Sequence, residues 1–180
     1  MASDSLRSLA RHLDVPERTL RRAASQGLIH GERTSPRRFR ISMREEAYLR
    51  SHWPLLRGLR DALRTEPNVR LAVLFGSQAT GTATAQSDVD VLVVLSDSSA
   101  SRVAAVAGRL ERRIGRSVQL VRLEDAERAP VLMAAALERG RVLVDREGRW
   151  QELQRRLSAW QARAAEAEVP LADAMPDLNR

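Results

Sequence analysis

Apolar residues recur at helical spacing in two short segments near the N-terminus. The first segment, residues 5–13, contains Leu6, Leu9, Ala10 and Leu13. The period then breaks and resumes in residues 16–27, where Pro16 suits the first turn of a helix and Gly27 suits its left-handed end. The pattern therefore predicts two short helices joined by a tight turn.

The spacing between these helices favours a helix-turn-helix. Ala10, Val15 and Leu20 are five residues apart, so that a small side chain lets the helices approach while two apolar side chains fill the angle. Asp14 stands in the turn, where such proteins often have glycine, and aspartate tolerates the unusual backbone angles required there.

A basic hairpin is predicted after the second helix. Residues 28–42 alternate apolar and polar positions on both sides of a Gly, Thr, Ser and Pro cluster. We expect residues 1–42 to form a winged helix-turn-helix that binds DNA. The residues expected to contact phosphates or base edges are Arg18, Thr19, Arg21, Arg22, Arg37, Arg38 and Arg40. The alternative is a small helical domain whose solvated arginine face packs on the rest of the protein or on a partner.

A long amphipathic stretch at residues 43–66 predicts a connecting helix. Ser42 and Glu45 match a capping box at its start, and apolar residues follow three or four apart. Pro54 lies inside the stretch, which predicts a bend or a restart of the helix. We expect the apolar stripe to be buried, either as core or as the seam of a homodimer.

Two mainly aliphatic runs, residues 69–75 and 89–95, predict a pair of buried strands. The segment between them is polar and contains glycine, which predicts a loop or short helix. Gly76 lets backbone come close to a ligand, and Ser77 offers a hydroxyl and an amide to phosphate oxygens. A helix, a strand, and a further helix and strand follow, up to Asp145.

Asp88 and Asp90 stand at the start of the second aliphatic run. Two residues apart in a strand, they would share one face about 7 Å from each other, where one or two hard cations fit. A carboxylate in an apolar strand is costly unless a cation or strong donors compensate it, and Mg²⁺ does so while it binds a triphosphate. The alternative is that Asp88 caps the loop and Asp90 lies at an exposed strand edge.

The charge and composition of the chain indicate which class of partner it binds. The net charge is +5 over residues 1–50 and +2 over residues 51–180, so the positive excess lies in the predicted N-terminal domain. This favours nucleic acid as a partner, ahead of an anionic membrane. The chain has no cysteine and no long apolar run, so we expect a cytoplasmic protein without a membrane span, a disulfide or a thiolate metal site.

The central residues resemble a known family. The Gly-Ser pair at 76–77 and, after ten residues, the Asp-Val-Asp-Val run at 88–91 are similar to the signature of the DNA polymerase β-like nucleotidyltransferases, especially the minimal (MNT) type. The resemblance covers roughly residues 69–145. It implies an α/β (α+β) fold with a mixed sheet flanked by helices, for a domain at residues 67–148.

This resemblance also implies a chemistry. A nucleoside monophosphate would pass from a nucleoside triphosphate, with ATP the expected nucleotide, to a protein or nucleic-acid hydroxyl, and pyrophosphate would be released. Asp88 and Asp90 would bind two Mg²⁺ ions, while Gly76 and Ser77 would hold the phosphates. Minimal nucleotidyltransferases often serve as antitoxins beside a HEPN-type toxin, which implies such a protein as a partner.

The sequence departs from the family pattern at one position. The family's third carboxylate is expected in the middle of the strand that follows the helix, where this sequence has Gln119. An amide oxygen can coordinate a metal, but it carries no charge and cannot accept the acceptor's proton. The alternative function is therefore a weak or inactive transferase domain in a DNA-binding regulator or antitoxin that senses nucleotide or binds a partner.

The last predicted segment, residues 149–180, contains a helix and a tail. Trp150, Leu153, Leu157 and Trp160 recur at helical spacing, which predicts one helix packed on the domain or on another copy. From Val169 onward, prolines and the lack of a period predict a loose tail.

Overall fold

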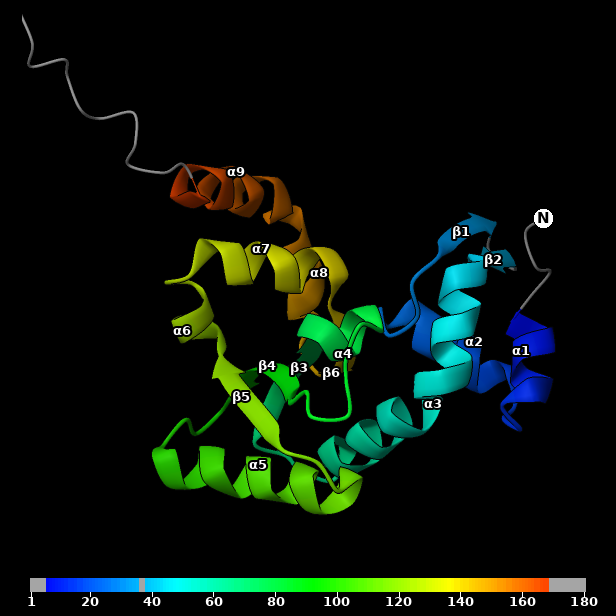
Figure 1. The fold of residues 1–180 in the computed structure, drawn as a ribbon, viewed down its shortest axis with the longest axis horizontal. Helices are drawn as coiled ribbons and strands as arrows, with labels where there is room; N and C mark the ends of the chain where they lie inside the picture. The colour runs from blue at the N-terminus through cyan, green and yellow to red at the C-terminus, as the bar shows by residue number, and fades with distance from the viewer. Residues whose placement is uncertain (1–5, 36–37, 169–180) are drawn as a thin grey trace, which may run out of the picture.

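The computed structural model describes residues 6–35 and 38–168. Two short helices and an antiparallel hairpin form its N-terminal part (Figure 1). These elements are α1 (Leu6–His12), α2 (Glu17–Ser25), β1 (Glu32–Ser35) and β2 (Arg38–Arg40). Leu9 and Leu20 are fully buried between the helices. Asp14 has φ +51° and is the only non-glycine residue at positive φ in the described part of the chain, as its turn position predicts.

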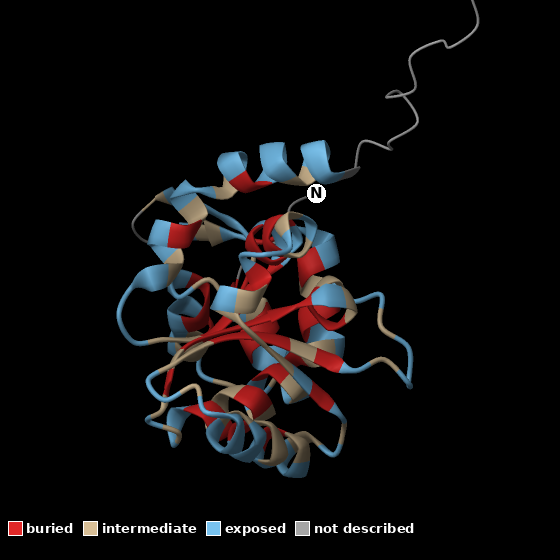
Figure 2. Cartoon of the chain, turned by 90° about the vertical axis from the view of Figure 1, so that its left-hand side faces the viewer, coloured by how far each residue is buried: buried red, intermediate tan, exposed pale blue. Residues whose placement is uncertain are grey.

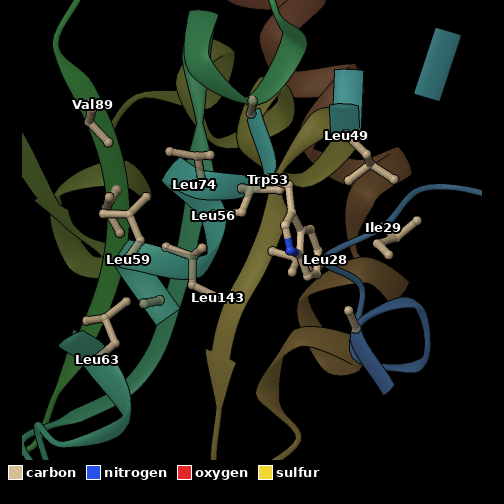
Figure 3. Close-up of a cluster of buried hydrophobic side chains, with 14 of the residues drawn as sticks. Leu28, Ile29, Leu49, Trp53, Leu56, Leu59, Leu63, Leu74, Val89 and Leu143 are labelled. Atoms are coloured by element: carbon tan, nitrogen blue, oxygen red, sulfur yellow. The ribbon is translucent and has the colours of Figure 1, made fainter. Parts of the chain in front are cut away.

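The connecting helix α3 (Met43–Arg64) is continuous, so the predicted restart at Pro54 does not occur. Its apolar stripe is buried within this chain, in the core that was one of the two expected locations. Figure 3 shows this core, in which Trp53 of α3 lies between Leu28 of the N-terminal part and Leu143 of the sheet. One hydrophobic cluster therefore joins the N-terminal part to the rest of the molecule.

The central sheet has four strands in the order β5-β4-β3-β6. They are β3 (Val69–Phe75), β4 (Val89–Leu95), β5 (Val118–Arg122) and β6 (Arg141–Asp145). β3 is antiparallel to both β4 and β6, whereas β4 is parallel to β5, so the sheet is mixed as predicted. The central strands are almost wholly buried (Figure 2), because helices cover both faces.

The remaining helices complete these layers. They are α4 (Gly76–Thr80), α5 (Ala100–Ile114), α6 (Leu123–Ala126), α7 (Pro130–Arg139), α8 (Arg149–Arg155) and α9 (Leu157–Glu168). Side chains of α3 and α5 pack on one face of the sheet through Leu74 and Val91. Side chains of α7 pack on the other face through Val73 and Leu92.

The C-terminal segment forms two helices where one was predicted. α8 lies beside β6 and α9 runs along α7, so the chain changes direction at Arg156 (Figure 1). Leu153 and Trp160 are buried in the same cluster as α7, which confirms the expected packing on the domain. The predicted tail from Val169 onward lies outside the described residues. No helix within residues 6–35 and 38–168 is both long and apolar enough to cross a membrane.

Candidate functional site

Gly76 lies where β3 ends and the chain turns into α4. Phe75 is paired with Asp90 across β3 and β4, so the turn meets the Asp90 side chain. Gly76 has φ +69°, and a Cβ at this position would lie 2.5 Å from Asp90 Oδ2. The backbone of the turn therefore contacts the carboxylate directly, and a side chain at residue 76 would displace it.

Asp88 and Asp90 form the acidic part of the site. Asp88 is exposed directly before β4, and Asp90 is half-buried within it, with Asp88 close enough for its charge to act on Asp90. Within the described residues, neither carboxylate forms an ion pair or a hydrogen bond. Burial, and then the negative charge of Asp88, raise the pKa of Asp90. Two repelling carboxylates without donors favour the binding of a cation.

Gln119 occupies the position predicted for the third carboxylate. β5 runs parallel to β4 with Gln119 paired to Asp90, and the Gln119 side chain is exposed. The described residues contain no group of three or more His, Cys, Asp or Glu side chains placed to hold a metal ion. Two carboxylates and an amide oxygen are hard donors that fit one Mg²⁺ bound with a triphosphate. They fit a second Mg²⁺ less well, because the negative charge is too small.

Arg116 holds the loop before Asp88, a contact that no pattern in the sequence predicts. Its Nη2 donates to the carbonyls of Ser87 and Thr84, at 2.7 and 3.3 Å. With the buried Gln78 amide oriented so that its oxygen faces Arg116, that oxygen accepts from Nη1 and Nη2 at 3.1 and 2.7 Å. Because Ser87 precedes Asp88, these bonds position the acidic loop relative to α4.

A buried ion pair supports α4 from the other side. The Arg141 guanidinium donates to both oxygens of Glu45, at 2.6 and 2.8 Å, and to the Ala79 carbonyl at 2.8 Å. It also lies over the Tyr48 ring, 3.6 Å from its centre. Tyr48 in turn donates its hydroxyl to the Gln78 carbonyl at 2.9 Å, so α3 and β6 together fix the helix that follows Gly76.

This ion pair corrects one expectation about Glu45. Ser42 Oγ accepts from the Glu45 amide at 3.1 Å, which is the first half of the predicted capping box. The Glu45 carboxylate accepts from the His30 amide at 2.9 Å and from Arg141, in place of the helix cap. Burial, and then the charge of Arg141, lower the pKa of His30, which lies at the same junction.

The described residues predicted to bind DNA lie on α2 and on the β1–β2 hairpin. Arg18, Thr19 and Arg22 line a cavity between α2 and the body of the protein. All five described arginines of this set are exposed, namely Arg18, Arg21, Arg22, Arg38 and Arg40. The Arg21 Nε atom donates to Glu17 at 2.8 Å. Arg37 lies outside the described residues.

The fold and this site agree with a comparison against protein families. A model described as polymerase beta, nucleotidyltransferase, matches residues 58–149, which include Gly76, both aspartates and Gln119. The chain belongs to the polymerase β nucleotidyltransferase family. In this nucleotidyltransferase the matched part begins inside α3 and ends at the first residue of α8. A search of curated proteins finds no match.

Solved structures share the fold of this nucleotidyltransferase. A chain of a crystal structure described as a toxin–antitoxin with AMP-PNP is 26% identical, with a TM-score of 0.52 over 67% of this chain and 98% of its own. A mutant of the toxin–antitoxin MntA-HpeT is 24% identical, with a TM-score of 0.53 over 67% and 98%. The tri-AMPylated Shewanella oneidensis HEPN toxin in complex with MNT antitoxin gives 23% identity and a TM-score of 0.50 over 69% and 99%.

Proposed function

We propose that this nucleotidyltransferase binds Mg²⁺ and a nucleoside triphosphate, with ATP the expected nucleotide, and transfers the nucleoside monophosphate to a hydroxyl of a protein partner. The observation that carries the proposal is the Asp90 carboxylate, which contacts the Gly76 turn and lacks a compensating donor within the described residues. The related toxin–antitoxin structure with AMP-PNP supports an adenine nucleotide as ligand and a protein as partner. The HEPN class of that partner follows from the resemblance to minimal nucleotidyltransferases.

Each residue of the site has a separate task in this proposal. Asp88 and Asp90, once deprotonated, would hold Mg²⁺, which neutralises phosphate charge when it is bound. The Gly76 turn brings backbone against the carboxylate, and the amide and hydroxyl of Ser77 would donate to phosphate oxygens. The acceptor oxygen attacks the α-phosphorus, the bond to the bridging oxygen breaks, and pyrophosphate leaves. The site's contribution is largely the positioning of these groups.

The amide at Gln119 limits the expected rate of this reaction. Its side chain, paired in register with Asp90, can accept a hydrogen bond from the acceptor hydroxyl but cannot take its proton. The proton must therefore pass to water, and transfer should be slow. For the same reason we propose a second function, in which the transferase domain binds nucleotide with little turnover and the chain acts as a DNA-binding regulator or antitoxin. The exposed hairpin residues Arg38 and Arg40 support the DNA-binding part of this proposal.

The test of both functions uses α-³²P-labelled ATP, Mg²⁺ and a purified HEPN-type protein as acceptor. We expect Mg²⁺-dependent ATP binding and label on the partner, both lost in Asp90→Asn and both kept in the exposed control Asp97→Asn. Binding without transfer by the wild type and by Gln119→Asp would leave the regulatory function. If ATP binding has no Mg²⁺-dependent part that is lost in Asp90→Asn, the proposed site is wrong.

A further inference from the structure

A cavity of about 1090 Å³ lies between α2, α3 and the segment from β6 to α8, away from the Asp88–Asp90 site. Four of the arginines that line it form no ion pair within the described residues. These are Arg18, Arg22, Arg60 and Arg64. The cavity lies outside the proposed transfer site, and Arg18, Arg22 and Arg64 on its lining are exposed.

The acidic residues of the cavity leave this positive charge largely uncompensated. Asp61 lies 3.8 Å from Arg57 and 3.5 Å from Arg113. Both oxygens of Asp145 accept from backbone amides at the start of α8, at 3.1 Å each. The lining contains six arginines and three aspartates, so it is net positive.

Two side chains of the lining carry buried donors without an acceptor. They are Trp53 Nε1 and Arg60 Nε, the only buried side-chain nitrogen or oxygen atoms in the described part of the chain that lack a hydrogen-bond partner. Trp53 is only 6% exposed. Buried polar atoms are almost always hydrogen-bonded in folded proteins, so the wall of this cavity is the part of the described structure whose polar groups are least satisfied.

Arg60 lies close enough to Arg22 and Arg64 for their positive charges to act on it. Its Nη2 donates to Gln26 at 2.6 Å, which fixes the guanidinium against the end of α2. Burial, and then the charges of Arg22 and Arg64, lower the pKa of Arg60. An anion bound among these three side chains would relieve their repulsion, and a phosphate matches the geometry of guanidinium donors.

The size and the aromatic lining of the cavity restrict the ligand further. Small-molecule sites typically measure about 300–1,000 Å³, which is close to this volume, whereas a DNA duplex needs an open surface. Trp53 and Trp150 add flat apolar surface to the arginine cluster. Trp150 also packs at Gly27, where a Cβ would lie 3.4 Å from its Nε1, so the cavity joins the N-terminal part to the transferase part.

We propose that this cavity is a second ligand site, for a nucleoside phosphate whose phosphate groups contact Arg22, Arg60 and Arg64 and whose ring lies near Trp53 and Trp150. Binding there needs no divalent metal, because guanidinium groups supply the positive charge. A ligand at this position bridges α2 to β6 and α8. Nucleotide binding is therefore coupled to the way the N-terminal part packs on the rest of the protein.

The test measures ATP binding to the full chain in EDTA, by calorimetry and by tryptophan fluorescence. Wild type and Asp90→Asn should bind one ATP with equal affinity, because this site is independent of Mg²⁺. The double variant Arg22→Gln/Arg64→Gln should bind about tenfold more weakly or worse, since each side chain gives a charged hydrogen bond. Arg112→Gln on α5 removes the same charge far from the cavity and should bind like wild type. Inorganic triphosphate should compete with ATP, and adenosine should not.

Several results would overturn this proposal. One is the absence of saturable ATP binding by the wild type in EDTA, and another is equal affinity of the double variant and Arg112→Gln. Loss of duplex DNA binding in the double variant, without any ATP binding by wild type, would assign Arg22 and Arg64 to DNA.

Discussion

Glu45 and Arg141, 96 residues apart in the sequence, form a bidentate ion pair at 2.6 and 2.8 Å in the interior of the protein. Their side chains are 7% and 4% exposed. Through Arg141 the pair reaches the carbonyls of Leu28 and Ala79, so one cluster of polar contacts connects the N-terminal part, α3, α4 and β6. The turn at Gly76 is therefore built on an ionic contact as well as on the hydrophobic core.

Breaking this pair should strongly destabilise the fold. Glu45→Gln leaves the Arg141 charge buried without its counter-charge, which should lower the free energy of unfolding by about 3–5 kcal/mol. Glu46→Gln is the matched control, because its partner Arg50 is 45% exposed, and it should cost about 1 kcal/mol or less. Urea unfolding at neutral pH measures both. Similar decreases in the free energy of unfolding in the two variants would show that the buried pair contributes no more to stability than the exposed pair.

Alanine variants at Gly76 and Gly115 should separate the effect of backbone strain from the effect of contact with Asp90. Both have φ +69°, but a Cβ at Gly115 meets nothing within 4 Å, whereas one at Gly76 meets Asp90 Oδ2. Alanine at either position should cost about 1–2 kcal/mol of stability because of the positive φ. Only Gly76→Ala should also weaken Mg²⁺-dependent ATP binding, since it displaces the carboxylate. Equal ATP affinity of the two variants, measured by calorimetry, would remove Gly76 from the site.

The raised pKa of Asp90 predicts a dependence of stability on pH. A carboxyl group with a higher pKa in the folded chain binds more protons there than in the unfolded chain. The free energy of unfolding should therefore fall as pH rises from about 3.9, the ordinary aspartate value, to the raised pKa of Asp90, and stay lowered above it. Asp90→Asn removes this loss, so it should be more stable than wild type at pH 7 and equally stable below about pH 3.9.

Asp88→Asn is the companion variant for this titration. It removes the neighbouring negative charge, so the pKa of Asp90 should decrease and the stability at pH 7 should increase, by less than in Asp90→Asn, because burial remains the larger cause. Thermal unfolding from pH 3 to pH 8 gives the comparison. A wild-type stability that rises through this pH range in step with both variants would contradict the prediction.

Restoring a carboxylate at residue 119 should increase turnover. Gln119→Asp places a charged oxygen on β5 beside Asp90, where it can bind metal and accept the acceptor's proton. General-base catalysis contributes about 100-fold or more, so we expect an increase in label transfer of at least about tenfold. Gln161→Asp, on the exposed side of α9, is the control for added charge. An unchanged transfer rate in Gln119→Asp would show that proton acceptance does not limit the reaction.

The exposed arginines of the hairpin should carry any contacts with DNA phosphates. Arg38→Ala and Arg40→Ala should each weaken duplex binding and reduce its salt dependence by about one counterion. Arg112→Ala on α5 removes the same charge from a different surface and should have little effect. Binding titrations at several salt concentrations measure this. If all three variants behave alike, the hairpin is not the binding surface, and a helical domain packed on a partner becomes the better interpretation.

The local pattern of apolar residues was sufficient to predict the strands that surround the candidate site. The strands at Val69–Phe75 and Val89–Leu95 have the bounds that their apolar runs predict, because burial on both faces leaves a continuous aliphatic signature. Consecutive strands usually pair, so the approach of Gly76 to Asp90 followed from sequence order. The place of Gln119 in the site was expected from the resemblance to the nucleotidyltransferases. The roles of these residues toward metal and phosphate stay predictions.

Contacts between distant segments were decided only by the tertiary structure. Nothing in the neighbourhood of Glu45 distinguishes a helix cap from a partner of Arg141, because the choice depends on which strand passes beside α3. The same applies to Arg22, which is exposed and also lines a cavity where α2 packs against the body; its predicted contact with DNA stays a prediction. The sequence by itself thus determined most of the helices and strands, the adjacency of the two strands that carry Gly76 and Asp90, and the surplus of positive charge. Only the packing of distant elements determined which of those charges are buried, paired or left facing a cavity, since local periodicity contains no information about what lies opposite a side chain.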